Sequence, residues 1–334
     1  MWRIWTRILA MLACALPLGV GNAAQDEPVL VLEATIPLDG VSGRIDHMAL
    51  DPGRGRLLVA ALGNGTVEAI DIASRRVMHR IAGLKDPQGV GYAAATDEIV
   101  VASAGDGTVR FFRAEDYAPA GRIVLVDDAD NVRIEPRTGN VLVGYGSGGL
   151  AIIDPKTRTK IGDAKLPAHP EGFQLAPEGG KAFVNVPDAR QIVVVDLAAG
   201  RQIATWRLAD SRANFPMAID RTGRQLASVT RNPSRLLLFD TGSGSLAEQR
   251  ETCGDADDVF FDAKRARIYI SCGAGAIDVF EGKNSGFARL ARIETESGAR
   301  TSLFVPELDR LFVAARAGML GGQARLLVFR PSPP

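Results

Sequence analysis

The chain has 334 residues, with 39 Lys and Arg against 39 Asp and Glu, and it is 46% hydrophobic and 23% charged. This composition is typical of a globular protein and excludes a disordered or fibrous chain. Without a leader that contains Arg3 and Arg7, 37 basic residues face 39 acidic ones, a balance of −2. That balance is too even for a general nucleic-acid-binding protein.

The first 24 residues have the pattern of a secretory signal peptide. Two basic residues precede an apolar run over residues 8–18, and small residues fill 19–24. This order predicts cleavage after Ala23 or Ala24, and hence a periplasmic or secreted protein. The run is shorter than the ~20 residues that span a bilayer, and no later apolar segment is longer, so no membrane span is expected. A lipoprotein signal that uses Cys14 is the alternative.

Two cysteines, Cys253 and Cys272, are left after cleavage. An exported chain meets an oxidising environment, in which such a pair can close a disulfide. The alternative is a pair of buried thiols in neighbouring strands.

One pattern, a polar residue followed by an apolar run, recurs seven times along the chain. The starting residues are separated by 42, 42, 41, 44, 42 and 43 positions. The seven runs are Arg56–Ala60, Glu98–Ala102, Asn140–Gly144, Lys181–Asn185, Gln225–Val229, Arg267–Ser271 and Arg310–Ala314. A fixed period of this length indicates a repeat architecture.

A second apolar series follows each of these runs after a loop rich in Gly, Asn, Asp or Pro. It comprises Thr66–Asp71, Thr108–Arg113, Gly149–Asp154, Gln191–Asp196, Arg235–Asp240, Ala276–Glu281 and Arg325–Arg330. Entry strands such as His47–Leu50 and outer strands such as Val77–Ile81, Ala120–Leu125, Gln202–Leu208 and Ala288–Ile293 complete each unit. Their length and β-branched content predict four short strands a unit.

Four strands in about 42 residues are typical of a β-propeller blade. The fold class predicted is therefore all-β, a seven-bladed β-propeller with four antiparallel strands per blade. The seventh unit runs out of chain after its third strand, so we expect Val29–Ile36 to supply the missing outer strand of the last blade. Residues 25–334 are expected to form a single monomeric domain.

The turns before the third strands resemble those of the bacterial YVTN-type, YncE-like seven-bladed propellers. The residues that carry the resemblance are Asn64–Val67, Asp106–Val109, the Ile-Asp, Val-Asp and Phe-Asp endings of the third strands, and Arg310–Val313. The resemblance covers the whole mature chain. It implies an exported propeller, often described only as a binding protein, with the fold that the haem-d1-binding domain of cytochrome nitrite reductases shares. These motifs identify architecture and not a ligand.

The loops that enter the innermost strands of a propeller form one rim of the central channel, where ligands usually bind. The equivalent positions before the seven second strands are mostly polar. They are Asp46 and His47, Gln88 and Gly89, Asp130 and Asn131, Glu171 and Gly172, Asn214 to Pro216, Asp257 and Asp258, and Arg300 and Thr301. The carboxylates are expected to face one another with Arg300 as the only strong cation in register, and crowded carboxylates need a cation or a proton. A merely solvated channel mouth is the alternative.

The main hypothesis is binding without catalysis, of a small molecule, a peptide or a periplasmic partner protein. The residues predicted to bind the ligand are Asp46, His47, Gln88, Asp130, Asn131, His169, Glu171, Asn214, Asp257, Asp258 and Arg300. Arg231 and Arg316, on loops between second and third strands, could recognise a carboxylate.

Calcium is the cofactor considered for a second hypothesis, because Ca²⁺ takes carboxylate and amide oxygens. Its candidate ligands are Asp46, Asn131, Asn214, Asp257 and Asp258. The site would be similar to that of six-bladed paraoxonase-type and gluconolactonase-type propellers, which hydrolyse lactones or esters, with His47 or His169 as the base. A third hypothesis is a protein-interaction scaffold whose contact loop is Ala317–Gly322. His79 falls on an outer strand and is expected to face solvent, so a three-histidine zinc site is not predicted.

Overall fold

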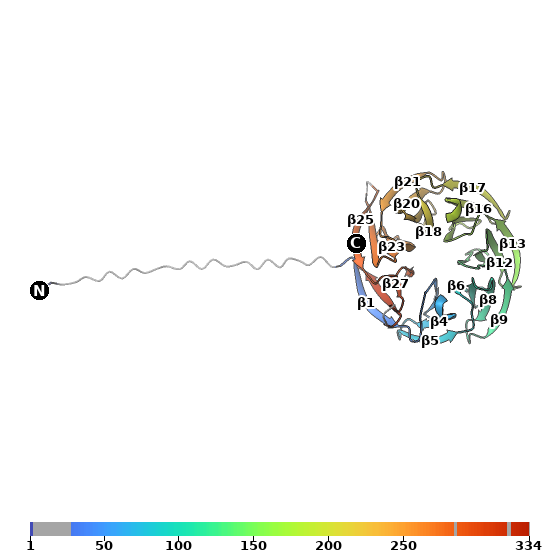
Figure 1. The fold of residues 1–334 in the computed structure, drawn as a ribbon, viewed down its shortest axis with the longest axis horizontal. Helices are drawn as coiled ribbons and strands as arrows, with labels where there is room; N and C mark the ends of the chain where they lie inside the picture. Colours follow the sequence, from blue (N-terminus) through green and yellow to red (C-terminus); the bar gives the residue numbers. More distant parts are fainter. Residues whose placement is uncertain (3–27, 284–285, 319–321, 334) are drawn as a thin grey trace.

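A computed structural model describes residues 1–2, 28–283, 286–318 and 322–333. It contains seven four-stranded antiparallel sheets arranged as blades around a central axis (Figure 1). The predicted seven-bladed propeller is therefore confirmed. The predicted signal peptide falls almost entirely on residues outside the described ranges and stays a prediction. No helix among the described residues is long and apolar enough to cross a membrane.

The blades follow one another along the chain. Blade 1 comprises β2 (Met48–Asp51), β3 (Arg56–Ala61), β4 (Thr66–Asp71) and β5 (Arg76–Ile81); blade 2, β6 (Pro87–Ala93), β7 (Glu98–Ser103), β8 (Thr108–Arg113) and β9 (Pro119–Val124); blade 3, β10 (Val132–Ile134), β11 (Val141–Tyr145), β12 (Gly149–Asp154) and β13 (Thr159–Lys165). Blade 4 comprises β14 (Phe173–Leu175), β15 (Lys181–Val186), β16 (Gln191–Asp196) and β17 (Arg201–Arg207); blade 5, β18 (Arg212–Ile219), β19 (Gln225–Asn232), β20 (Ser234–Asp240) and β21 (Leu246–Glu251); blade 6, β22 (Ala256–Asp262), β23 (Arg267–Cys272), β24 (Ala276–Lys283) and β25 (Gly286–Glu294).

Blade 7 joins the two ends of the chain. It contains β26 (Ser302–Val305), β27 (Arg310–Ala315), β28 (Arg325–Pro331) and, outermost, β1 (Leu30–Pro37). β1 pairs with β28 from Leu30 opposite Pro331 to Pro37 opposite Arg325, so the two segments lie side by side in Figure 1. The expected closure is confirmed, and it leaves no open strand edge between the first and last blades.

The second and third strands of each blade are buried on both faces because each blade packs between two neighbours. All six residues of β3 are buried, whereas β5 at the outer edge is mostly exposed. Leu57 and Val59 of blade 1 pack with Leu326 and Val328 of blade 7 in one cluster. Such two-sided packing explains why these strands read as continuous apolar runs in the sequence.

A repeated backbone pattern sets the start of the innermost strands. In blade 1 the Asp46 N–H donates to the Ala60 carbonyl at 2.7 Å, and the Ala60 N–H donates to the His47 carbonyl at 3.0 Å. The same exchange joins Asp130 and Asn131 to Gly144, and Glu171 and Gly172 to Asn185. In blades 2, 5 and 6 the innermost strand extends further and has a β-bulge at this point. The rim positions are thus structurally equivalent around the channel.

Candidate functional site

The structure places seven of the predicted ligand-binding residues around one small cavity at the channel mouth. They are Asp46, His47, Asp130, Asn131, Glu171, Asp257 and Asp258. The cavity has a volume of about 30 Å³, enough for one or two water molecules or a single small cation. Arg44 and Arg133 also line it and were not predicted from the sequence.

Two of the acidic residues in this ring are neutralised by arginines. Asp46 Oδ2 lies 2.6 Å from Nη2 of Arg44. Asp257 lies between Arg300, whose Nε is 3.1 Å from Oδ2, and Arg231. Arg300 is the only arginine at the register positions, but two further arginines from outside the register pair with the same carboxylates. Arg44 and Arg231 could not be identified as these partners from the sequence because they lie outside the repeated register.

Arg231 is fully engaged within the protein. Its guanidinium lies 4.1 Å from the ring centroid of Phe215 and also contacts the carboxylate of Asp255, at 3.3 Å. Asp255 in turn accepts a hydrogen bond of 2.7 Å from Arg300. The predicted role of Arg231 in recognising a carboxylate ligand therefore competes with two internal carboxylates. Arg316 has no ion pair with any described residue, and its guanidinium lies close to Gly298.

The Asp130, Glu171 and Asp258 carboxylates form no ion pair with an arginine of the described residues, and Asp258 accepts a backbone hydrogen bond of 2.7 Å from Ser302. Asp130 is 4% exposed, and its Oδ1 accepts no hydrogen bond from a described residue. The nearest positively charged candidates are two imidazoles: His47 Nε2 lies 3.7 Å from Oδ1, and His169 Nε2 lies 3.9 Å from Oδ2. The Glu171 carboxylate forms no hydrogen bond or ion pair within the described part of the chain.

Burial and mutual repulsion raise the pKa of three ring carboxyls, those of Glu171, Asp258 and Asp46. Burial, together with the charge of Asp130, raises the pKa of Glu171 to about 8. Burial likewise raises the pKa of Asp258 to about 7 and that of Asp46 to about 6. For His169, burial lowers the pKa, but contacts with Asp130 and with the Gly146 carbonyl outweigh it and raise the pKa to about 9. Protons therefore compensate part of the negative charge at the mouth.

Two buried asparagines next to the ring differ in what they face. Asn131 lines the cavity, is 2% exposed, and has an Oδ1 without a hydrogen-bond donor among the described residues. Asn214 instead lies in the seam between blades 4 and 5, where its Nδ2 donates to Asn185 Oδ1 at 2.8 Å. The sequence placed Asn214 at the rim as the neighbour of the register positions Phe215 and Pro216, which do line the cavity. The bulge of β18 between Asn214 and Met217 removes it from the cavity lining.

The other two predicted ligand-binding residues lie beside the cavity. Gln88 directs its Nε2 to Asp128 at 3.4 Å, and His169 holds the Gly146 carbonyl with Nδ1 at 2.6 Å. In the described ranges no group of three or more His, Cys, Asp or Glu side chains is placed to share a metal ion. The calcium hypothesis for Asp46, Asp257 and Asp258 stays a prediction.

Beneath the mouth, the channel opens into a larger cavity of about 390 Å³. His47, Arg133 and Asp258 line both cavities and so form the partition between them. Arg133 donates one hydrogen bond, of 2.9 Å, to the carbonyl of Val132 and lies 5.5 Å from the ring centroid of Phe173. Burial lowers the pKa of Arg133, while Asp258 and Asp130 oppose that change.

Cys253 and Cys272 form a disulfide with an S–S distance of 1.99 Å. Cys253 immediately precedes the segment that carries Asp255 and Asp257, and Cys272 ends β23. Of the two alternatives that the sequence left open, the structure has the bonded form. The bond ties the entrance loop of blade 6 to its second strand.

Two further predictions concern the surface. His79 lies exposed on β5, where its ring stacks on Tyr117 with centroids 3.9 Å apart. In the segment Ala317–Gly322, residues 319–321 are outside the described ranges, so its role as a contact loop stays a prediction.

The fold and this mouth together define a seven-bladed β-propeller with an acidic channel entrance. Searches found no matching family model and no matching curated protein. Among solved structures, the chain is similar to a chain of hydrazine synthase from Kuenenia stuttgartiensis, with a TM-score of 0.77, 14% identity, and coverage of 91% of this chain and 99% of the other. It is also similar to a chain of the mitotic checkpoint complex, with a TM-score of 0.78, 14% identity, and coverage of 97% and 98%. At this identity, the likeness shows the fold alone.

Proposed function

We propose that the protein is a binding protein that captures an ammonium group at the mouth of its channel. The observation that carries the proposal is the set of donor-free oxygens around the cavity. Asp130 Oδ1 and Asn131 Oδ1 accept no hydrogen bond from described residues, and the Glu171 carboxylate has no partner there. A buried acceptor without a donor costs about 1–3 kcal/mol, which a ligand with N–H groups would recover.

The size of the mouth limits what enters it. A cavity of about 30 Å³ accommodates the head of a primary amine but not a bulky ligand. The rest of the ligand would extend into solvent or toward the larger cavity behind His47 and Arg133. A small amine, a peptide or a lysine of a periplasmic partner protein could each supply the head group.

Isothermal titration calorimetry with methylammonium chloride at pH 8 tests the proposal. Replacement of Asp130 by Asn or of Glu171 by Gln should weaken binding at least tenfold, since each removes a charged acceptor worth about 1.5–3 kcal/mol. Asp188→Asn is the matched control, because Asp188 is an exposed acid on a second-to-third-strand loop. Equal binding by all four proteins would contradict the proposal.

A second experiment separates an amine site from a calcium site. After treatment with EDTA, Ca²⁺ and methylammonium are added separately, and the melting temperature and lactone hydrolysis are followed. An amine-binding protein gains stability from methylammonium and is indifferent to chelator. A calcium-dependent hydrolase loses stability with EDTA and regains turnover with Ca²⁺, and it loses both responses in Asp257→Ala with Asp258→Ala.

Export is part of the proposal. It is supported by the leader pattern of residues 1–24, by the disulfide, and by the resemblance to YVTN-type propellers. N-terminal sequencing of protein recovered from a periplasmic fraction should begin at Ala24 or Gln25. An intact Met1 in a cytoplasmic fraction would contradict it.

A further inference from the structure

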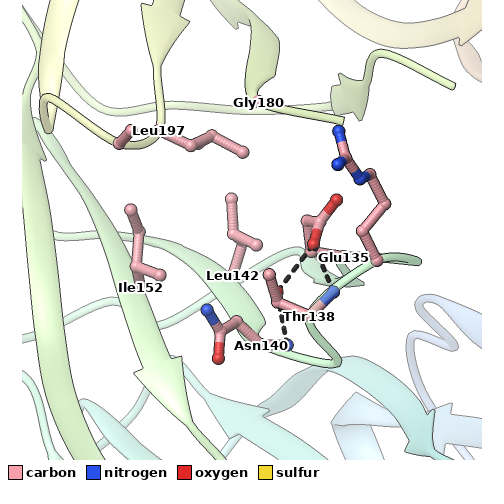
Figure 2. Close-up of a pocket in the computed structure, with 9 residues that line it drawn as sticks. Glu135, Thr138, Asn140, Leu142, Ile152, Gly180 and Leu197 are labelled. Carbon is pink, nitrogen blue, oxygen red and sulfur yellow. Dashed lines mark hydrogen bonds between the residues drawn. The ribbon is translucent and has the colours of Figure 1, made fainter. Parts of the chain in front are cut away.

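A third cavity, of about 360 Å³, opens between blades 3 and 4 on the opposite face of the propeller. Figure 2 shows Glu135, Asn140, Leu142 and Ile152 on the blade 3 side, facing the segments of blade 4 that carry Gly180 and Leu197. Glu135, Asn140 and Gly180 lie in the turns at the far end of β10 and β14 from the mouth. Leu142 and Ile152 lie in β11 and β12, and Leu197 lies in the turn after β16. The cavity is therefore independent of the site described above.

The repeat shows what normally fills this position. Glu135 ends the innermost-strand segment of blade 3 five residues before Asn140, as Asp51 does in blade 1 five residues before Arg56. In blade 1, Arg56 is 1% exposed, and its Nε donates to Asp51 Oδ2 at 2.8 Å. Its Nη2 donates to the carbonyl of Ala114, in the turn after the third strand of blade 2. An arginine thus plugs the seam between blades 1 and 2.

Two other seams are bridged by a charged side chain from the same register position. Glu98 of blade 2 pairs with Arg158 in the turn of blade 3. Arg267 of blade 6 donates to the carbonyl of Ser332 in blade 7 at 3.0 Å. The seam between blades 3 and 4 has Asn140 at this position, and the Asn140 side chain forms no hydrogen bond with a described residue.

The acid of this arrangement is present in blade 3, but the arginine at the register position of Arg56 is missing. Burial raises the pKa of Glu135, but hydrogen bonds from Thr138 and the charge of Arg137 outweigh it and lower the pKa. Glu135 is 4% exposed, and its Oε2 accepts hydrogen bonds of 2.7 and 2.6 Å from the N–H and hydroxyl of Thr138. Its Oε1 is buried and has no donor among the described residues. Arg137, in the same turn, directs Nη1 to the carbonyl of Glu178 in blade 4, at 3.0 Å.

The remaining walls suit an aliphatic stem. Leu142 and Ile152 are buried in the core cluster between blades 3 and 4, and Leu197 packs against it. Leu197 occupies the turn position of Ala114: each N–H donates to the equivalent carbonyl, Leu197 to Gly180 at 3.0 Å and Ala114 to Asp97 at 2.9 Å. The carbonyl that receives the guanidinium of Arg56 thus has a counterpart here.

We infer that this cavity binds an alkylguanidinium group, with the charge on Glu135 and the Leu197 carbonyl and the stem against Leu142 and Ile152. The group enters from outside and takes the place that Arg56 takes in blade 1. Either a small guanidine or an exposed arginine side chain of a peptide supplies it.

The probe is n-propylguanidinium chloride, which reproduces the arginine side chain, and n-propylurea is its neutral counterpart. Isothermal calorimetry on the full mature protein should detect binding of the first and at least tenfold weaker binding of the second. Glu135→Gln should weaken propylguanidinium binding at least tenfold. Glu178→Gln, an exposed glutamate on the adjacent turn, is the matched control and should change nothing.

Asn140→Arg is the second variant. It restores the arginine of blade 1, so it should abolish propylguanidinium binding and raise the melting temperature. Binding of acetyl-Ala-Arg-Ala-amide at least as tight as that of propylguanidinium would assign the site to peptides, and weaker binding would assign it to small guanidines. Three outcomes would each overturn the inference. They are unchanged propylguanidinium binding in Asn140→Arg, equal losses in Glu135→Gln and Glu178→Gln, and equal binding of propylurea and propylguanidinium. Asp130→Asn at the mouth should leave propylguanidinium binding intact. The guanidinium site and the proposed ammonium site can therefore fail independently of each other.

Discussion

His47 Nε2 of blade 1 lies 3.7 Å from Asp130 Oδ1 of blade 3, although blade 2 stands between them in the ring. The residue of blade 2 that is equivalent to His47 is Gly89, and a Cβ at Gly89 would overlap the Asp130 carbonyl oxygen. The absence of a side chain at Gly89 lets blades 1 and 3 meet, so one imidazole and one carboxylate from separate blades lie beside the same small cavity.

Gly89→Ala should therefore disturb both the fold and the mouth. The added methyl group meets backbone, which cannot rotate away, and overpacking of this kind costs about 2 kcal/mol. Gly53→Ala is the control, because a Cβ there would lie 3.6 Å from Asp51 Oδ1, an ordinary contact. Urea denaturation should show the loss for Gly89→Ala alone, together with weaker methylammonium binding. Equal stability of the two variants would show that the ring tolerates a wider separation.

Asn185 is a structural residue that the sequence argument did not single out. It is fully buried, and its Nδ2 donates to the carbonyls of Phe215 and Pro216 at 3.0 and 3.1 Å. Its Oδ1 accepts from Asn214 at 2.8 Å and from Ser228 at 3.0 Å. Asn185→Ala should lower the free energy of unfolding by about 3 kcal/mol, because it leaves several buried groups unpaired. Ser228→Ala removes a single bond and should cost about 1 kcal/mol. Similar losses in denaturant melts would contradict this difference.

The disulfide should stabilise the blade that carries Asp255 and Asp257. Cys253 and Cys272 are 19 residues apart, and in the chain-entropy model a loop of that size contributes about 3 kcal/mol. The double variant Cys253→Ser, Cys272→Ser should unfold at correspondingly lower denaturant concentration. Wild-type protein in dithiothreitol provides the control and should match the variant. A variant as stable as the oxidised protein would show that packing alone holds the loop.

The blades could be predicted from the sequence because each one repeats the same strand pattern at a nearly constant interval. It also identified most of the mouth, because the repeated register places Asp46, Asp130 and Glu171 at equivalent backbone positions. It did not predict which carboxylates are neutralised, since Arg44 lies two residues outside that register. Side-chain pairing across blades depends on the distances between blades, which cannot be read from the sequence of one repeat.

A local irregularity accounts for the one predicted residue that turns away from the channel into a blade seam. Asn214 lies one residue before the register position of blade 5, and beside the bulge in β18 it bonds to Asn185 in the seam. The missing arginine of blade 3 is the converse case, because Asn140 looks like an ordinary strand start until Asp51 and Arg56 are compared with it in space. A repeat predicts position, and departures from it become informative only when the neighbouring blade is known.

The protein should become less stable as the pH rises, because titrating groups at the mouth have raised pKa values. Glu171 has a pKa raised by burial to about 8, and Asp258 to about 7, so each holds its proton more tightly in the folded state than in the unfolded chain. His169, with a pKa of about 9, does the same. Stability therefore falls with pH wherever the folded state binds more protons, for Glu171 from about 4.5 to about 8 and for His169 from about 6.5 to about 9.

Glu171→Gln removes one of the two large carboxyl contributions to this effect. The variant should be more stable than wild type at pH 8 by at least about 1 kcal/mol, with little difference at pH 4.5, because one pKa unit corresponds to 1.36 kcal/mol. Guanidinium unfolding at pH 4.5, 6, 7 and 8 measures this slope, and Glu307→Gln, at an exposed glutamate, should run parallel to wild type. A wild-type stability that rises over this range, or a Glu171→Gln profile parallel to it, would mean that the Glu171 carboxyl already has a stabilising partner and that the mouth has no unmet charge for an ammonium ligand to neutralise.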